Sequence, residues 1–300
     1  SINDYSFRNC SKLKTIKLSK NLNRLEDGLF QDCSSLISID IQNINYISSN
    51  TFYKCSNLKT VTFGEKLTTI GENGFCNCHN LTNIILPNSL NYIGKSSFYG
   101  CYSLTDITIP SGVETISSDT FGNCINLKSI TIPQSVNIIN IDAFDFCKNL
   151  ESINVDDENK YFKSIEGILF SKSQSILHYY PNGKRASSYT VPDGVETIIE
   201  HCFDNNAYIN TIILPDSIIE IKSYAFYQCA NLETINFPVN LESIQSYSFG
   251  YCINLKSVNL NEKLEQLDYC AFYGCESITS ITIPNGLKEV RYYSFASCKK

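Results

Sequence analysis

The sequence predicts a repeat solenoid, in which the chain winds into coils that stack on one another. Phenylalanine and cysteine recur together as FxxC at an interval of 23 residues, for example at Phe98/Cys101 and Phe121/Cys124. Aliphatic residues recur at fixed places between successive pairs. A fixed period of this length is the signature of a solenoid, in which each coil buries its apolar stripe only against its neighbours.

Eleven FxxC pairs occur, in two runs, which is too regular a pattern for coincidence. Phe203 keeps the register, 23 residues before Phe226, but Asn206 stands in its cysteine position. The pairs are Phe7/Cys10, Phe30/Cys33, Phe52/Cys55, Phe75/Cys78, Phe98/Cys101, Phe121/Cys124, Phe144/Cys147, Phe226/Cys229, Phe249/Cys252, Phe272/Cys275 and Phe295/Cys298.

Each repeat is expected to contain two short extended segments and a turn. In one repeat, residues 104–109 (LTDITI) predict a short strand, because apolar anchors alternate with β-branched residues and a proline follows. Residues 113–116 predict a second extended segment, since no apolar face of helical period is long enough for a stable helix. A tight, 3₁₀-like turn is expected at 121–124. Stacking then places short parallel strands on one face and short strands and turns on the other.

A one-residue deletion falls where this framework tolerates it. The repeat between Cys33 and Cys55 has 22 residues, and the missing residue lies between Ile41 and Ile44. Most other repeats carry proline and two loop residues there, so the deletion leaves the buried positions in phase.

Residues 151–206 interrupt the array. From Cys147 to Asn206 is 59 residues, which is one repeat of 23 and 36 more. Two β-rich runs, GILF and SILHYYP, are separated by SKSQ, and this pattern predicts a β-hairpin with a four-residue loop. We therefore expect a single domain over 1–300, with repeats in 1–150, a variant repeat with a hairpin insertion in 151–206, and repeats in 207–300. Two arrays that flex at the insertion are the alternative.

Composition excludes several function classes. The chain has 30 acidic and 24 basic residues and a net charge of -6, without the basic surface that nucleic acid requires. No apolar run approaches the roughly 18 residues of a membrane span. Methionine is absent, and the array starts and stops within a repeat, so we expect a piece of a longer protein or coil ends that associate end to end.

The repeat resembles the BspA-like leucine-rich repeats found in surface proteins of bacteria and protists. The stretch LTDITIPSGVETISSDTFGNC matches that class's LxxIxIPxxVxxI pattern followed by a spacer and FxxC. The resemblance covers the whole chain except the interruption. It implies a leucine-rich-repeat superhelix and an association with adhesion to host cells, matrix proteins or other microbes.

The cysteines are expected to be free and buried. Eleven of the fourteen share one repeat position, where parallel side chains of stacked coils disfavour disulfides and a small thiol suits a tight cavity. Zinc is disfavoured because the only CxC, Cys76/Cys78 beside His79, has no second ligand pair. Cys76, Cys202 and Cys270 lie outside the shared position and are the better candidates for solvent-facing or reactive thiols.

No catalytic or cofactor site is predicted. The three histidines, His79, His178 and His201, lie in different repeats, and no nucleophile or phosphate-loop motif is present. His201 precedes Cys202, but adjacency alone does not make a catalytic base. The acidic cluster at 156–158 (DDE) is expected to be a solvated turn, with a weak calcium site as the alternative.

Partner-binding candidates come from positions expected to face solvent. The position between the two strand anchors is mostly small and polar, which suits solubility alone, but Ile85 and Ile213 break the pattern and are candidate contacts. Lys17 and Asp40 occupy the same position and are also candidates. Its members are Lys17, Asp40, Thr62, Ile85, Thr108, Thr131, Asn154, Ile213, Asn236, Asn259 and Thr282.

A second candidate surface is rich in tyrosine. Tyr224, Tyr247 and Tyr293 share the position two residues before phenylalanine, with Cys270 in the fourth place. Tyr269 and Tyr292 lie beside them. Tyrosine is favoured at interfaces because it combines rigid area with a polar tip, although it also fills scaffolds. Two sequons, at Asn9 and Asn80, are glycosylation candidates if a eukaryotic cell exports the protein.

The residues favour a non-enzymatic protein-interaction module. The resemblance implies that it is part of a cell-surface or secreted adhesin with a host-cell, matrix or microbial protein partner. An intracellular protein-docking scaffold in the cytoplasm is the alternative, favoured by the many unpaired thiols. A glycan-binding module that uses the tyrosines is a third hypothesis.

Overall fold

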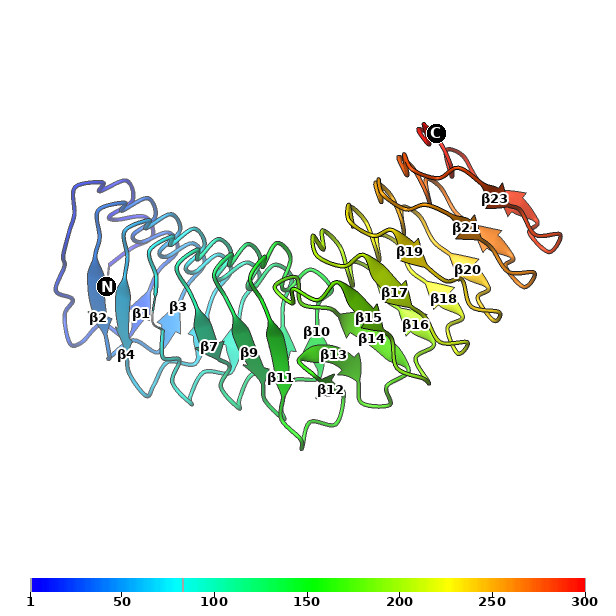
Figure 1. Ribbon diagram of the computed structural model, residues 1–300. Coiled ribbons are helices and arrows are strands. Elements are labelled where there is room, and N and C mark those ends of the chain that lie inside the picture. Colours follow the sequence, from blue (N-terminus) through cyan, green and yellow to red (C-terminus); the bar gives the residue numbers. More distant parts are fainter. Residues whose placement is uncertain (1, 83, 300) are drawn as a thin grey trace. The chain divides into compact units, whose positions relative to one another are not determined.

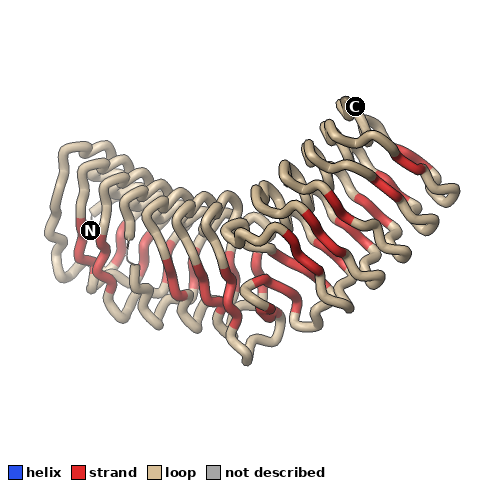
Figure 2. Tube along the Cα trace, in the orientation of Figure 1, coloured by secondary structure: helices blue, strands red, loops and turns tan. Residues whose placement is uncertain are grey.

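The computed structural model describes residues 2–82 and 84–299. These residues form stacked coils of short strands and turns, and no helix occurs among them (Figures 1 and 2). The chain divides into two compact units, Ser1–Tyr161 and Phe162–Lys300, which are called unit 1 and unit 2. Each is a solenoid with two faces of parallel strands, so the predicted fold class is confirmed.

Unit 1 carries one set of strands on each face. The first strands of its coils pair in parallel as β2 with β4 and as β7, β9 and β11. The second strands pair in parallel as β1, β3, β5 and β6, and as β8 and β10. Their bounds are β1 Arg24–Leu25, β2 Ser38–Ile41, β3 Tyr46–Ile47, β4 Thr60–Phe63, β5 Thr69–Ile70, β6 Tyr92–Ile93, β7 Asp106–Thr108, β8 Thr115–Ile116, β9 Ser129–Ile132, β10 Ile138–Ile139 and β11 Ser152–Val155.

Unit 2 repeats this arrangement after its inserted strands. The first strands are β15, β17 and β19, then β21 and β23; the second strands belong to one sheet, β12-β13-β14-β16-β18-β20-β22-β24. Their bounds are β12 Phe162–Ile165, β13 Ile168–Ser171, β14 Ile176–Tyr179, β15 Ser188–Thr190, β16 Thr197–Ile198, β17 Thr211–Ile213, β18 Glu220–Ile221, β19 Thr234–Ile235, β20 Ser243–Ile244, β21 Val258–Asn259, β22 Gln266–Leu267, β23 Ile281–Thr282 and β24 Glu289–Val290.

The 23-residue period appears directly in the strand register. Ser129 pairs with Ser152 and Ile130 with Ile153, so equivalent residues of successive coils lie side by side. Along a first strand the side chains alternate between core and solvent, as in β2, where Ile39 and Ile41 are buried. Apolar residues at alternate positions therefore form continuous buried rows.

The core of each unit is lined by a column of phenylalanine rings. Phe75, Phe98 and Phe121 are fully buried, and successive ring centroids lie 5.5 and 5.8 Å apart with the planes within 5° of parallel. In unit 2, Phe226 and Phe249 stack at 4.9 Å. The predicted inward position of the phenylalanines is confirmed.

The turn around FxxC is more specific than the expected 3₁₀-like turn. It contains i→i+3 hydrogen bonds, such as Cys101 N–H to the Phe98 carbonyl, but left-handed residues interrupt it two positions before and two after the phenylalanine. At Ser96 and Gly100, for example, φ is 52° and 69°. Each turn also hydrogen-bonds to the next coil, as where Phe98 N–H donates to the Thr120 carbonyl at 3.0 Å.

All fourteen cysteines are free, and twelve are buried. In the repeated position the thiol donates to the phenylalanine carbonyl of the preceding coil, as from Cys124 Sγ to Phe98 O at 3.1 Å. Burial raises the pKa of Cys147 to about 12. The thiols therefore act as small core groups with one weak hydrogen bond each. Cys10 is exposed and Cys298 is half-buried.

The expectation for the other three cysteines was wrong. Cys76, Cys202 and Cys270 have exposed fractions of 5%, 1% and 6%, so they are not solvent-facing thiols. Burial raises the pKa of Cys76 to about 11, and it raises the pKa of Cys202 well above its usual range. A departure from the repeated position therefore did not mean exposure: Cys202 belongs to the core of unit 2, and Cys76 and Cys270 are buried within the turns.

The insertion forms the predicted hairpin and one strand more. β13 and β14 pair antiparallel across the four residues 172–175, and β12 precedes them as an additional antiparallel partner of β13. Glu166 and Gly167 connect β12 to β13 with φ of 52° and 80°, the two positive φ values that a type I′ turn requires.

Tyr180 is a core anchor that the FxxC pattern does not include. Its ring is 1% exposed, stacks on Phe203 at 4.9 Å and lies 23 residues before it. Tyr180 therefore occupies the phenylalanine position of a further coil, whose cysteine position holds Gly183. The interruption is thus one long coil of 36 residues, from Phe144 to Tyr180, followed by a regular coil of 23.

Candidate functional site

The first-strand position predicted to face outward is exposed in every coil. Ile85 has an exposed fraction of 86% and Ile213 of 50%, so both isoleucines stand on a polar sheet surface. They lie in different units and form no common patch that the structure defines.

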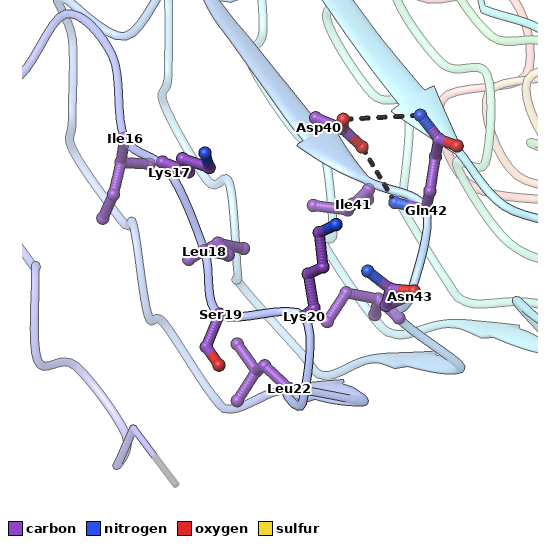
Figure 3. A pocket seen from close by; sticks show the side chains of 11 residues that line it. Ile16, Lys17, Leu18, Ser19, Lys20, Leu22, Asp40, Ile41, Gln42 and Asn43 are labelled. Atoms are coloured by element: carbon purple, nitrogen blue, oxygen red, sulfur yellow. Dashed lines mark hydrogen bonds between the residues drawn. The ribbon is translucent and has the colours of Figure 1, made fainter.

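Lys17 and Asp40 border a pocket of about 550 Å³ between the first two coils (Figure 3). Ile41 and Ile44 form part of its apolar wall. The Asp40 carboxylate accepts hydrogen bonds from the backbone N–H and the Nε2 of Gln42 at 3.1 and 3.3 Å. The pocket adjoins the shortened loop after Ile41, where a one-residue deletion leaves less chain to fill the space beside the longer loop of the preceding coil.

The tyrosines of unit 2 gather on the surface made by its FxxC turns, and this surface is called the tyrosine face. Three of them, Tyr269, Tyr292 and Tyr293, have exposed fractions of 44%, 74% and 69%. The tyrosine face comprises Tyr224, Tyr227, Tyr247, Tyr251, Tyr269, Tyr273, Tyr292 and Tyr293.

Rings of the tyrosine face pack on one another from coil to coil. His201 stacks on Tyr224 at 5.1 Å, and Tyr224 on Tyr247 at 5.2 Å, each pair within 5° of parallel. Tyr251 meets Tyr227 edge-on at 5.6 Å. Tyr224, Tyr247, Tyr227 and Tyr251 therefore partly cover one another, whereas Tyr292 and Tyr293 remain mostly exposed.

The predicted ladder of Tyr224, Tyr247 and Tyr293 is interrupted at Cys270. The hydrogen bond to the Cys270 thiol raises the pKa of Tyr247 to about 12. Tyr293 has no ring partner among the described residues. Tyr269 and Tyr292 stack on each other beside the ladder at 6.0 Å, and the Arg291 guanidinium lies 5.5 Å from the Tyr269 ring centroid.

The backbone beneath three of these tyrosines is in an unfavourable conformation. Tyr224, Tyr247 and Tyr293 have φ of 59°, 55° and 61°, in the left-handed region that glycine and asparagine tolerate best. A bulky residue there costs about 1 kcal/mol relative to glycine. Unit 1 begins with Tyr5 in this position and continues with small or polar residues, namely Gly28, Asn50, Asn73, Ser96 and Asp119.

His201 and Cys202 do not form a catalytic pair. His201 Nδ1 lies 2.9 Å from Asp204 Oδ2, and its ring packs on Tyr224 in the surface layer, whereas the Cys202 thiol is buried in the core. Within 2–82 and 84–299 no group of three or more His, Cys, Asp or Glu side chains converges as a metal site. In the 156–158 cluster, the Asp156 carboxylate accepts the Glu158 N–H at 2.9 Å, which forms a local turn.

The two sequons differ in their surroundings. Asn9 is exposed in a turn with φ of 60°. Asn80 is half-buried, and its Nδ2 donates to Asn57 Oδ1 of the preceding coil at 2.9 Å. A glycan on Asn80 would replace an N–H of that amide, so Asn9 is the more accessible candidate.

Sequence reasoning missed several members of the tyrosine face. Tyr227, Tyr251 and Tyr273 occupy the positions one or two residues after phenylalanine, which the repeat pattern treats as variable. Their signal was available in the equal spacing of 23 residues between Phe226, Phe249 and Phe272, which brings the residues that follow them together.

Comparison with solved structures supports the same architecture. The pneumococcal vaccine antigen PcpA is 30% identical, with a TM-score of 0.79 over 88% of this chain and 68% of that chain. A leucine-rich cell surface protein from Faecalibacterium prausnitzii is 28% identical, with a TM-score of 0.73 over 95% and 83% of the two chains. A leucine-rich repeat protein from Bacteroides ovatus is 23% identical, with a TM-score of 0.71 over 99% and 80%, and it shows the fold alone.

No curated protein shows significant sequence similarity to this chain. None of the described residues forms a helix with the length and hydropathy of a membrane span. The model of the BspA type leucine-rich repeat region matches in six copies, over residues 1–101, 68–184 and 174–300. Together with the stacked coils and their FxxC turns, this match shows that the chain belongs to the BspA-type leucine-rich repeat family.

Proposed function

We propose that this chain is a non-enzymatic protein-interaction module of a cell-surface or secreted adhesin, and that the tyrosine face is its main contact with a protein partner. Solenoids provide extended surfaces whose exposed residues vary on a constant framework. The tyrosine face is such a surface, built on successive coils of unit 2.

The observation that carries the proposal is the left-handed backbone at Tyr224, Tyr247 and Tyr293. Asparagine or glycine tolerates this conformation better than tyrosine, and the equivalent position of unit 1 holds Gly28, Asn50 and Asn73. Residues that cost stability yet stay at the surface are typical of functional sites, and of these three Tyr293 is 69% exposed while Tyr224 and Tyr247 are half-buried. Tyrosine, with tryptophan and arginine, is also enriched at the energetic centre of protein interfaces.

The relatives support the proposed location. Two similar solved structures are named as a pneumococcal vaccine antigen and a leucine-rich cell surface protein. We extend that location to this chain as part of the proposal. The partner would be a host-cell, matrix or microbial protein, and Ile85, Ile213, Lys17 and Asp40 are secondary contact candidates.

The test is binding of the purified chain to cultured epithelial cells and to immobilised matrix proteins, measured by flow cytometry and surface plasmon resonance. The variant Tyr269→Ala/Tyr292→Ala/Tyr293→Ala removes the three most exposed rings of the tyrosine face. We expect it to weaken binding at least tenfold, because truncating one tyrosine at the centre of an interface commonly costs roughly 1 kcal/mol or more of binding free energy.

The matched control is Tyr92→Ala. Tyr92 is 53% exposed on β6 of unit 1, away from the FxxC turns, so its removal should leave binding unchanged. Equal binding by the triple variant and the wild-type chain would disprove the role of the tyrosine face. Failure of the wild-type chain to bind any cell or matrix protein would disprove the adhesin function itself.

A further inference from the structure

Unit 1 has a hollow on the surface formed by its FxxC turns, and this hollow is called the ring gap. Its volume is about 440 Å³. Tyr53 and Tyr99 stand two coils apart on either side of Cys76, at a separation of about 10 Å for two strand spacings. The residues that line the ring gap are Asn50, Tyr53, Asn73, Cys76, Asn77, Ser96, Tyr99 and Asp119.

The same eight positions exist in unit 2, shifted by a constant number of residues. Tyr53 and Tyr227 are 174 residues apart, and so are Tyr99 and Tyr273. The equivalent of Cys76 is Gly250. The two amides of the central coil, Asn73 and Asn77, have Tyr247 and Tyr251 as equivalents. In both units, therefore, two tyrosines flank a small residue. The central coil differs, because it carries two asparagines in unit 1 and two tyrosines in unit 2.

In unit 2, aromatic rings fill the space between the two flanking tyrosines. Tyr251 makes edge-to-face contacts with Tyr227 at 5.6 Å and with Tyr273 at 5.3 Å. Tyr247 contacts the same two rings at 6.1 and 6.3 Å. A phenol ring thus fits between tyrosines held two coils apart on this backbone.

In unit 1, the corresponding space contains no ring. Among the described residues neither Tyr53 nor Tyr99 packs on another aromatic ring, and the central amides are shorter than the tyrosines they replace. Asn77 Nδ2 is within 3.5 Å of Cys76 Sγ, and Asn73 Nδ2 is 3.2 Å from Asn50 Oδ1, so both amides bond along the wall. The hollow is bounded by two phenols and floored by a buried thiol.

We propose that the ring gap binds one tyrosine side chain of a partner polypeptide. The inserted ring would meet Tyr53 and Tyr99 edge-to-face, as Tyr251 meets Tyr227 and Tyr273. This site lies in unit 1 and does not depend on the function proposed for the tyrosine face.

The polar lining favours tyrosine over phenylalanine. The Asp119 carboxylate supplies an acceptor for the phenolic hydroxyl, and the pKa of Asp119 is raised by desolvation and then by the neighbouring Asp142. Above that pKa Asp119 is ionised, and a hydrogen bond to a charged acceptor is stronger than one between neutral groups. A sugar ring is the competing ligand chemistry, but nothing in the molecule provides a template for it, whereas Tyr251 provides one for a phenol.

The experiment is an NMR titration of the full chain with N-acetyl-tyrosinamide at pH 7. We expect the side-chain amide signals of Asn73 and Asn77 to shift with a dissociation constant on the order of 1–10 mM, as suits a single buried ring. N-acetyl-phenylalaninamide should bind about tenfold more weakly because it lacks the hydroxyl. Methyl glucoside and N-acetylglucosamine serve as the sugar arms.

Two reciprocal variants connect the result to the ring gap. Asn77→Tyr introduces the ring that unit 2 carries at Tyr251 and should abolish the titration. The double variant Tyr247→Asn/Tyr251→Asn removes both rings that contact Tyr227 and Tyr273, and it should raise the number of sites from one to two. Asparagine is well suited to both positions, where φ is 55° and 59°, so this variant is expected to fold.

Three results would overturn the proposal. The first is that the amide signals of Asn73 and Asn77 do not shift at 20 mM N-acetyl-tyrosinamide, roughly the limit for a site of this strength. The second is tighter binding of either sugar than of the tyrosine derivative. The third is a single site in a folded Tyr247→Asn/Tyr251→Asn chain, which would show that the space between flanking tyrosines is not the recognition element.

Discussion

Units 1 and 2 are built from the same kind of coil, but the surfaces formed by their FxxC turns differ. In unit 1, eight residues that include Asn73 and Asn77 line an open hollow, and in unit 2 the rings of Tyr247 and Tyr251 pack between the equivalent flanking tyrosines. The buried residues beneath them, Phe75 and Phe249, are alike. The inward residues of the FxxC turn therefore stabilise the coil in both units. The outward residues differ, from small polar residues that leave a hollow to tyrosines that fill it.

The strongest test of the shared framework is to remove one ring from each unit. Phe98→Ala and Phe249→Ala should each lower the free energy of unfolding by about 3–5 kcal/mol, because both rings are fully buried between stacked neighbours. Urea unfolding would measure the loss. Phe146→Ala is the control, since its ring is 49% exposed. Very different losses for the two core variants would mean that the units are not equivalent.

Unit 2 should be less stable to acid than unit 1, because of His178 on β14. Burial lowers the pKa of His178 from 6.5 to about 4, so the folded state favours the neutral ring. Above pH 6.5 the ring is neutral in both the folded and the unfolded chain, so it does not reduce stability. As pH falls towards 4 the unfolded chain takes up a proton that the folded chain does not, and the free energy of unfolding decreases by about 2–3 kcal/mol. Hydrogen exchange by mass spectrometry, which resolves the units, should show unit 2 opening first.

His178→Gln is the matched control for the acid effect. It removes the titrating ring, so unit 2 should lose less stability between pH 6.5 and 4 than it does in the wild-type chain. An unchanged pH profile in this variant would assign the acid sensitivity to other groups.

A smaller effect on stability is expected from replacing Tyr180 with the phenylalanine that most other coils carry in this position. Tyr180 fills a phenylalanine position, and its buried hydroxyl has no hydrogen-bond partner among the described residues. Tyr180→Phe removes that group and should stabilise the chain by about 1 kcal/mol. Thermal unfolding would detect it, with Tyr161→Phe as the exposed control. A loss of stability would indicate that the hydroxyl is in fact hydrogen-bonded in solution.

The smallest expected effect concerns the left-handed turn position. Tyr293→Asn exchanges a bulky residue at φ of 61° for one that tolerates this conformation, and Tyr293 has no ring partner among the described residues to lose. Stability should rise by a few tenths to about 1 kcal/mol in urea unfolding. If stability falls instead, the tyrosine serves the scaffold rather than an interface.

The framework could be predicted from the sequence because it repeats. The spacing of Phe98, Cys101 and their equivalents predicts which residues are buried, and the run that ends at Tyr179 predicts a hairpin. Tyr180 escaped because it keeps the spacing but changes the residue type. A periodic pattern shows which positions are buried, but it does not show which other residue types can replace the usual one there.

The candidate surfaces were less predictable. The tyrosines of the repeated position could be identified, but the left-handed backbone at Tyr224 depends on turn geometry that a spacing does not contain. The exposure of Cys76, Cys202 and Cys270 was predicted wrongly because side-chain packing over a turn depends on neighbours one coil away. The ring gap itself follows from what Asn73 and Asn77 leave unfilled, and a sequence shows no empty space.

Ten of the eleven repeated thiols donate to a backbone carbonyl, and their packing bears on the redox conditions that the folded chain tolerates. Nine of the eleven repeated cysteines, Cys124 among them, are buried between coils, so in the folded chain a reagent the size of glutathione meets only Cys10 and Cys298 of this set. The number of unpaired cysteines is therefore a poor guide to the compartment. Packing, rather than a reducing environment, protects the buried thiols once the solenoid has folded.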